Sequence, residues 1–497
     1  MMMNVRQGLT VLLVTCAFGA TGQGLADVMQ YSRQDPLGSA RAMGMGGAMT
    51  ALGADLGSIW SNPAGLGMYR SSDLSFSLGF GAGGARTDYL GTRNVAAAPH
   101  AIVGQLGVAL TMPMLSTDFK RSTFAIAYTP LKDFHQRAMW SGEAEGESIT
   151  DQFAQQANGT SFDSLWYYFP FDAELAWYTY LIDTVGGAAN QYAPAFTSDE
   201  VRQELRRDRS GRMGETTIGF GTSYRDQLHL GLSVGIVSTE MNRVDVYRES
   251  KISGPSSLQE LSLNDRLEIS GSGAYWSFGL ILQPKATPIR LGWSYRSGTV
   301  LSIEDFYQVD AAAQFAGSGS FEAGSPSSFV EYRIRTPRRH QLGFSWTLGK
   351  VAVVSVDYGQ TNYAQAEFIS EDFSTEDVDR IQNDIEDDFK LERQYRAGLE
   401  LRVQDELRFR IGGGWRSATA APLTNPFGDA DGSLIEDSGA MGHASIGGEY
   451  RVDNWYAGAT YRHTSTTDGR RLYGLGPEVA TGRTGLGLLM LTIGARY

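Results

Sequence analysis

The sequence predicts an all-β protein, a 14-stranded antiparallel transmembrane β-barrel with an N-terminal hatch, or plug, inside its lumen. Three observations lead to this prediction. First, the last strand alternates between apolar and small or polar residues and ends on an aromatic residue. Second, many other segments place charged residues and glycines on one side. Third, the connectors between segments alternate between long and short. A strand in hydrocarbon must belong to a closed sheet, because each unpaired backbone group there costs several kcal/mol.

The C-terminal strand, residues 484–497, has the clearest pattern. Counting back from Tyr497, every second residue is apolar, namely Ala495, Ile493, Leu491 and Leu489. The residues between them are smaller or more polar, namely Arg496, Gly494, Thr492 and Met490. One apolar side and a terminal aromatic residue are typical of strands in outer-membrane barrels.

Composition agrees with a barrel and argues against two other classes of protein. The chain has 497 residues, including 60 Gly, 23 Tyr, 23 Phe and a single Cys, and 42% of its residues are hydrophobic. After residue 30, no window approaches the roughly 18 apolar residues that a membrane helix needs. The net charge of −13 argues against nucleic-acid binding, which requires a basic surface.

Residues 1–26 are typical of a signal peptide. Arg6 supplies the positive charge, residues 9–20 supply the apolar stretch, and small residues permit cleavage after position 26. Cys16 lies within this segment, so we expect no disulfide in the mature chain. Residues 13–16 also weakly resemble a lipoprotein box, which leaves lipidation as the alternative. We expect the protein in the outer membrane of a Gram-negative cell.

Residues 73–497 are predicted to form the barrel. Fourteen alternating segments lie at about 73–82, 102–114, 121–133, 213–225, 227–244, 265–283, 289–302, 328–348, 351–363, 390–404, 406–417, 438–452, 454–463 and 484–497. Long connectors lie at 83–101, 134–212, 245–264, 303–327, 364–389, 418–437 and 464–483, and short ones separate the other neighbours. Outer-membrane barrels have even strand numbers, short periplasmic turns and long outer loops, so both chain ends should be periplasmic.

The connector at residues 134–212 is the longest and is rich in aromatic residues. We predict that it presents an outer surface for capturing apolar ligands, formed by Trp166, Tyr167, Tyr168, Phe169, Phe171 and Trp177. The alternative is that these aromatic residues form a small core of the loop itself. Within the same connector, residues 198–209 are predicted to form a charged helix with Ser198 as its N-cap.

Residues 27–72 do not alternate like a strand and are rich in small residues. Glycine allows close backbone approach and positive φ, and an Asn-Pro pair favours a turn. A 14-stranded barrel is too wide for its wall side chains to fill, so we predict that this segment is the hatch. The residues that define it are Gly44, Gly46, Gly47, Asn62, Pro63, Ala64 and Gly65.

The Gly-rich run at residues 39–55, followed by Asn-Pro-Ala-Gly at 62–65, resembles the hatch of the FadL/TodX outer-membrane transporters, in the form found in Bacteroidetes. The resemblance covers nearly all of the chain after the signal peptide. It implies a plugged 14-stranded barrel that carries hydrophobic compounds, typically long-chain fatty acids or aromatic hydrocarbons. It also implies sideways release beside a kinked third strand, and Pro130 near the end of segment 121–133 is compatible with such a kink.

The sequence offers no catalytic motif, metal-ligand spacing or cofactor motif, so we predict a non-enzyme without a cofactor. Basic residues on the inward side of the strands are candidate contacts for the head group of an anionic amphiphile, because a desolvated carboxylate needs charged donors. They are Arg290, Arg296, Arg402, Arg408, Arg410 and Arg416. The alternative is that these residues pair with Glu400, Glu449, Asp357 and hatch residue Asp55 and thereby fix the hatch.

The predicted function is passive uptake of hydrophobic compounds, most of all long-chain fatty acids or similar amphiphiles, through a channel gated by the hatch. The expected partners are such a ligand and outer-membrane lipid, with no nucleic acid, and we expect a monomer. The resemblance leaves one alternative, a FadL-like shuttle or anchor component of a protein secretion system, similar to PorV. A general porin is a third reading, which the hatch argues against.

Overall fold

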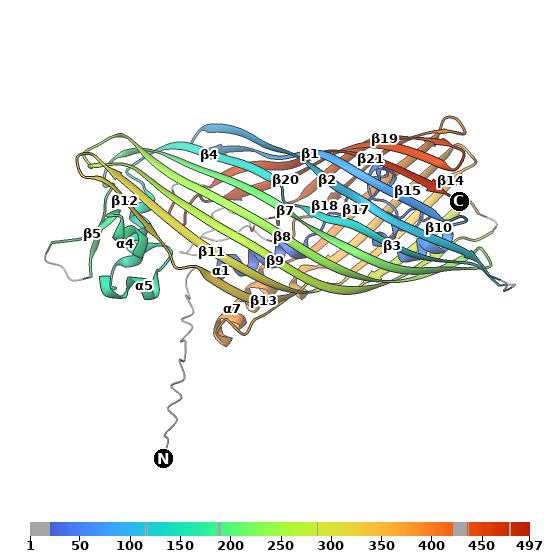
Figure 1. The fold of residues 1–497 in the computed structure, drawn as a ribbon, viewed down its shortest axis with the longest axis horizontal. Coiled ribbons are helices and arrows are strands. Elements are labelled where there is room, and N and C mark those ends of the chain that lie inside the picture. The colour runs from blue at the N-terminus through green and yellow to red at the C-terminus, as the bar shows by residue number, and fades with distance from the viewer. Residues whose placement is uncertain are drawn as a thin grey trace, which may run out of the picture.

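The computed structural model describes residues 20–497 except 115, 117, 187–189, 286, 421–434, 436 and 477–478. Most of the predicted signal peptide, residues 1–19, therefore lies outside the described residues. The described chain forms a long closed barrel with helical segments inside it and at one end (Figure 1). Closure comes from antiparallel pairing of the first strand with the last, from Asp73 opposite Arg496 to Asp88 opposite Thr481.

The wall contains 14 antiparallel strands among the described residues, as the sequence predicts. They are β1 (Asp73–Tyr89), β2 (Thr92–Pro113), β3 (Phe119–Asp133) continued by β4 (Gln136–Glu145), β7 (Glu200–Tyr224), β8 (Leu228–Ser253), β9 (Leu258–Leu282), β10 (Ile289–Arg296) continued by β11 (Val300–Phe315), β13 (Ser328–Arg335) continued by β14 (Arg339–Leu348), β15 (Ala352–Asn362), β17 (Leu391–Arg402), β18 (Leu407–Arg416), β19 (Met441–Val452), β20 (Trp455–Arg470) and β21 (Ala480–Arg496). Shorter strands β12 (Gly319–Gly324) and β16 (Glu367–Ile369) extend the sheet beside β11 and β13.

The outward side of the wall is apolar along much of its length. Its exposed residues include Phe76, Phe80, Leu110, Phe124, Ile126, Phe220, Leu232, Ile236, Leu291, Phe344, Ile411, Ile446, Leu491 and Ile493. The alternating inward positions are buried and carry polar, charged or glycine residues such as Ser233, Asp357 and Arg410. An apolar outer side and a polar inner side are the arrangement of barrels that lie in lipid.

Several strands extend much further than the sequence predicts. β7, β8 and β9 have 25, 26 and 25 residues, and the predicted connectors 83–101, 245–264 and 303–327 lie largely within strands. These predictions of loops were wrong because beyond the lipid both sides of a strand can be polar. The hydrophobic alternation then stops, although backbone pairing continues.

The helix predicted at residues 198–209 is also wrong. This segment begins β7, which pairs with β4 on one side and β8 on the other. Val201, Gln203 and Leu205 are buried at every second position, while the charged residues between them are more exposed. The period is therefore two, and Ser198 precedes a strand rather than capping a helix.

A small helical domain covers one end of the barrel, at the left of Figure 1. It contains α4 (Ile149–Ala157), the 3₁₀ turn η2 (Phe162–Ser164), α5 (Leu165–Tyr168), α6 (Ala173–Tyr178) and the hairpin of β5 (Ile182–Thr184) with β6 (Tyr192–Pro194). Ser148 and Asp151 form a capping box at the start of α4. The domain shares one apolar core with the outer parts of the neighbouring strands.

The N-terminal segment lies inside the barrel, where Figure 1 shows its blue helices. It comprises α1 (Ala20–Ser32), α2 (Ala40–Gly44), α3 (Ser58–Ser61) and the 3₁₀ helix η1 (Pro63–Met68). Almost every residue from 37 to 67 is buried or half-buried. Helix α7 (Thr375–Asp388) packs against α1 through Ile381 and Ile385. No helix in the described part of the chain is long and apolar enough to cross a bilayer.

Candidate functional site

Inward-facing glycines of the wall allow the hatch backbone to dock directly onto the strands. A Cβ at Gly412 of β18 would lie 2.2 Å from the Gly46 nitrogen, and one at Gly231 of β8 would lie 2.2 Å from the Pro63 carbonyl. Gly398 of β17 is packed in the same way against hatch residue Met45. The glycines on the inward side of the predicted strands therefore serve to accommodate the hatch.

Two of the predicted hatch residues adopt backbone conformations that favour glycine. Gly46 and Gly47 have φ of 62° and 75°, values in the left-handed region that side chains disfavour. Their turn follows α2 and leads from the contact of Gly46 with β18 towards β15. Thr50 then donates a 2.7 Å hydrogen bond from its hydroxyl to Asp357 of β15.

Asn62 ties the hatch together and anchors it to the wall. Its Oδ1 accepts a 3.0 Å hydrogen bond from the Ala64 amide and caps η1. Its Nδ2 donates to the carbonyl oxygens of Thr50 at 2.7 Å and of Leu280 in β9 at 3.2 Å. The Asn-Pro-Ala-Gly element is thus a buried turn that joins two parts of the hatch to a wall strand.

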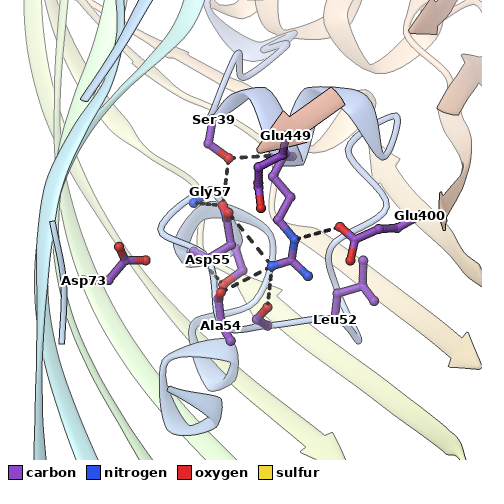
Figure 2. Close-up of polar contacts among 12 residues, drawn as sticks. Ser39, Leu52, Ala54, Asp55, Gly57, Asp73, Glu400 and Glu449 are labelled. Carbon is purple, nitrogen blue, oxygen red and sulfur yellow. Dashed lines mark hydrogen bonds and ion pairs between the residues drawn. The ribbon is translucent and has the colours of Figure 1, made fainter. Parts of the chain in front are cut away.

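A buried ionic network connects the hatch to β17, β18 and β19. Arg41 of α2 lies 3.3 Å from Glu400 and 4.0 Å from Asp55. Figure 2 shows Asp55 accepting hydrogen bonds from the Ser39 hydroxyl and the Gly57 amide, with Glu400 approaching from the wall. These contacts hold the loop between α2 and α3 against the barrel.

Arg410 is the centre of this network. Its guanidinium lies 2.6 Å from Glu400 and 2.8 Å from Glu449, and its side chain has no exposed area. Glu449 also pairs with Arg451, and Glu400 also pairs with Arg41. Buried charges of this kind need partners on each side, because removing one partner leaves an uncompensated charge.

The other candidate head-group arginines are distributed along the barrel. Arg296 pairs with Glu215 at 2.8 Å and lies over the Tyr275 ring, and Arg290 donates a 3.2 Å hydrogen bond to the hatch carbonyl of Leu52. Arg416 donates to the Gln34 carbonyl and pairs with Asp35. Arg402 pairs with Asp405 in a short turn. The geometry thus brings most of them to acidic groups or the hatch, and their role in ligand binding stays a prediction.

Arg408 lines a basic cavity at the end of the barrel where the short turns lie. The cavity has a volume of about 380 Å³. Its charged lining residues are Arg41, Lys350, Glu400, Arg402, Arg408, Arg451 and Arg496. Because its lining has six cationic groups and one carboxylate, this cavity is favourable for anions.

The wall loses its regular pairing between β2 and β3. The two strands pair from Pro113 opposite Arg121 up to Leu106 opposite Tyr128, and β2 continues beyond this point paired with β1. On its other side, the pairing of β3 with β7 shifts register between Pro130 and Lys132. β3 therefore bends away from β2 at the position where the sequence places Pro130.

The hatch takes the place of β2 at this bend. The Asp35 amide donates a 2.7 Å hydrogen bond to the Leu131 carbonyl, and the Leu37 amide donates a 3.0 Å hydrogen bond to the Pro130 carbonyl. These carbonyls lie in the stretch of β3 that leaves β2. A short piece of the hatch thus bonds to β3 where the wall strands separate.

A second cavity, of about 120 Å³, adjoins this bend. Its lining combines hatch residues Arg33, Asp35 and Leu37 with the junction of β3 and β4 and with β20 and β21. The same junction brings together three residues that the sequence spacing did not connect, His100 of β2, Asp133 of β3 and His135. The sequence gives no signal of this cluster, because His100 is far from the other two residues along the chain and only the arrangement of the strands at the bend places them together.

The predicted capture surface is divided in two. Trp166, Tyr167 and Tyr168 of α5 are exposed, with 59% of the Trp166 side chain accessible. Phe169 and Trp177 instead pack against the core of the outer helical domain, and Phe171 packs beside Tyr307 of β11. The alternative, a small core of the loop itself, is therefore confirmed for Phe169 and Trp177, whereas capture by the exposed rings stays a prediction.

Comparison with solved structures identifies proteins of the same fold. No family model matches the sequence, and neither does any curated protein at a significant level. The structure resembles the Pseudomonas putida toluene transporter TodX, with a TM-score of 0.53, 15% identity and coverage of 93% of this chain and 99% of TodX. It also resembles a Pseudomonas aeruginosa FadL homologue, with a TM-score of 0.53, 11% identity and coverage of 94% and 99%. At these identities the likeness establishes a shared fold, the plugged 14-stranded barrel.

Proposed function

We propose that this chain is an outer-membrane channel for passive uptake of hydrophobic compounds, gated by its hatch. The observation that carries the proposal is the bend in β3, where amides of Asp35 and Leu37 replace the pairing that β2 gives up. A wall completed by a removable segment can open sideways when that segment moves. Separating a regular strand pair would break a whole ladder of backbone hydrogen bonds in lipid, whereas two such bonds join residues 35–37 to β3.

The proposed path begins at the outer helical domain. An apolar compound contacts the exposed rings of Trp166, Tyr167 and Tyr168, loses water and enters the barrel. It then reaches the 120 Å³ cavity beside Leu37 and the β3–β4 junction. Movement of residues 35–37 releases it between β2 and β3 into the membrane.

We propose long-chain fatty acids or similar amphiphiles as the substrate class. The toluene transporter TodX and the FadL homologue have the same fold as this chain. This shared fold supports an apolar cargo. Within this proposal, one of the predicted lumen arginines contacts the head group, and Arg416 is the best placed because it pairs with Asp35, which lines the 120 Å³ cavity on the proposed path. A monomer and the Bacteroidetes form of the family remain parts of the proposal that the sequence alone supports.

The gate can be tested at Leu37 with a matched pair of variants. Leu37→Ala and Leu37→Pro both remove the apolar side chain, but only proline removes the amide that donates to Pro130. Losing a hydrogen bond worth about 1 kcal/mol should raise the open population about fivefold. We therefore expect faster uptake of labelled oleate into lipid vesicles by Leu37→Pro than by Leu37→Ala.

Uptake must first exceed that of protein-free vesicles. If the wild-type barrel moves neither oleate nor toluene, the channel proposal is wrong. Secretion of cargo proteins, compared between a deletion strain and its complemented form, then tests the shuttle or anchor role. Equal oleate rates in the two Leu37 variants would reject the gate while leaving the channel itself in place.

A further inference from the structure

We propose that His100, Asp133 and His135 form a binding site for a divalent transition-metal ion such as Zn²⁺. The ligand atoms of the three side chains all lie within 4.8 Å of one another. Two imidazoles and one carboxylate are a donor set that suits Zn²⁺, which uses nitrogen and oxygen ligands at about 2.0–2.2 Å. Binding of one ion by all three ligand atoms requires the two imidazole rings to turn out of their stacked arrangement.

The hydrogen bonding of His100 indicates that a cation belongs between the side chains. Its Nδ1 lies 3.1 Å from the Ala98 carbonyl oxygen, which can only accept, so this nitrogen carries a hydrogen. In the neutral ring, Nε2 then presents a lone pair, and it faces a carboxylate oxygen of Asp133. Two acceptors in contact require either a proton or a metal ion between them.

The second imidazole supplies the third donor atom beside the same carboxylate. His135 approaches the same carboxylate, with its Nδ1 2.8 Å from Oδ1 of Asp133. The two rings are stacked, with centroids 4.3 Å apart and planes 13° apart. A neutral His135 can donate from Nδ1 to the carboxylate, so the competing arrangement is a single added proton on His100. A dication would instead satisfy both ring nitrogens and the carboxylate at once and leave both rings neutral.

Burial and access also fit a metal site. The side chains of His100 and Asp133 are 8% and 3% exposed, while that of His135 is 34% exposed and leaves an entry path. The neighbouring cation Lys132 is already paired with Asp437 at 2.7 Å. Three protein ligands leave a fourth position for water, on the side of the 120 Å³ cavity that Asp133 and His135 line.

The position of the site suggests what the metal would do. His100 belongs to β2, whereas Asp133 and His135 belong to the junction of β3 and β4, on the other side of the stretch where these strands separate. An ion bound by all three would hold the two sides together. This regulatory consequence rests on the proposed function, and we expect bound Zn²⁺ to close the sideways route.

Metal binding can be measured without any transport assay. The full barrel, purified in detergent through a tag that contains no histidine, is titrated with Co²⁺ while its visible absorption is followed, and Zn²⁺ is then added as a competitor. We expect one ion per chain. His100→Gln, which keeps a polar side chain of similar reach, and His135→Ala should each weaken binding more than about tenfold.

His463→Ala is the matched control, because His463 is an exposed residue of β20 outside the cluster. It should bind Co²⁺ as the wild type does, and heat-modifiable electrophoretic mobility shows that each variant is folded. The site is rejected if folded wild-type protein binds no ion, or if His100→Gln and His463→Ala bind equally well. A folded His100→Gln barrel keeps this comparison valid even if His135→Ala fails to fold.

Oleate uptake into vesicles then tests the clamp. Zn²⁺ should slow uptake severalfold in the wild type and leave the His100→Gln rate unchanged. If Zn²⁺ binds but both rates are the same with and without it, the clamp is rejected and the site stands. If no variant takes up oleate under any condition, the proposed function fails, while the Co²⁺ titration still decides the site.

Discussion

Replacing Gly231 with alanine should dislodge the hatch from the wall. The added Cβ would lie 2.2 Å from the Pro63 carbonyl carbon and oxygen and 2.3 Å from the Ala64 nitrogen. Ordinary contacts between carbon atoms are about 3.5 Å or longer, so the backbones of β8 and η1 must separate by more than about 1 Å. Both are backbone segments, and no side-chain rotation relieves the contact.

The expected cost follows from what this movement breaks. Overpacking of a well-packed interior costs about 1–3 kcal/mol. The shift would also stretch the 3.2 Å hydrogen bond from Asn62 to the Leu280 carbonyl of β9, a loss of about 1 kcal/mol. We therefore expect Gly231→Ala to lower the free energy of unfolding by about 2–4 kcal/mol, measured by urea titration of the purified barrel.

Gly359→Ala is the matched control. Gly359 is an inward glycine of β15, and its added Cβ would approach only the side chains of Gln394, at 3.3 Å, and Gln341. Both variants change glycine to alanine in a strand, so the effect on the unfolded chain is the same and cancels in the comparison. Conductance in planar bilayers provides a second readout, since a displaced hatch should raise it. Equal stability and equal conductance for the two variants would refute the argument that wall glycines seat the hatch.

Three further predictions address the buried network, the outer domain and the capture surface. In a urea titration, Arg410→Met should lower the free energy of unfolding by about 3–5 kcal/mol, because it leaves Glu400 and Glu449 without their shared partner. The control Arg402→Met removes a surface pair and should lower the same free energy by less than about 1 kcal/mol. Glu249 of β8 accepts a hydrogen bond from the Ile149 amide at the start of α4. Burial raises the pKa of Glu249 from 4.5 to about 7, so the folded outer domain favours its protonated form. The contribution of Glu249 to the stability of this domain should be fully present below about pH 4.5 and should decline as pH rises towards about 7, by up to about 1.4 kcal/mol per pH unit. Hydrogen exchange of α4 should show this slope in the wild type. A slope that persists in Glu249→Gln would contradict the assignment. Trp166→Ala with Tyr168→Ala should slow the initial rate of oleate uptake severalfold while changing stability by less than about 0.5 kcal/mol; the idea fails if Phe329→Ala, at an exposed ring of β13, slows uptake as much.

The sequence predicted the barrel well within the lipid-facing region and poorly beyond it. The 14 segments, their order and the position of the last strand are confirmed by the register from β1 to β21. The reason is that lipid imposes an apolar residue at every second position, which is readable in one sequence. At residues 83–101 and 198–209 that constraint is absent, so strands paired in water looked like a loop and a helix.

For the candidate site, the residue types and a set of acidic partners could be predicted, but not which arginine meets which carboxylate. Glycines in the hatch and on the inward side of the strands indicated close packing, and the structure shows their backbones in contact. Glu400 and Glu449 were expected partners of the inward arginines, and the structure assigns both to Arg410. No local pattern indicated this assignment, or that Trp166 is exposed while Trp177 is packed. Such pairings depend on the register of strands that are far apart in the chain.

The sequence by itself therefore determined the closed apolar wall, its strand number and the segment that fills it, because hydrocarbon forces a period of two and a wide barrel needs a plug. Only the tertiary structure decided where the wall loses its pairing. There, residues 35–37 bond to β3 in place of β2, and His100 comes to face Asp133 and His135. Both arrangements result from the bend in β3, which changes neighbours across the barrel without leaving a pattern along the chain.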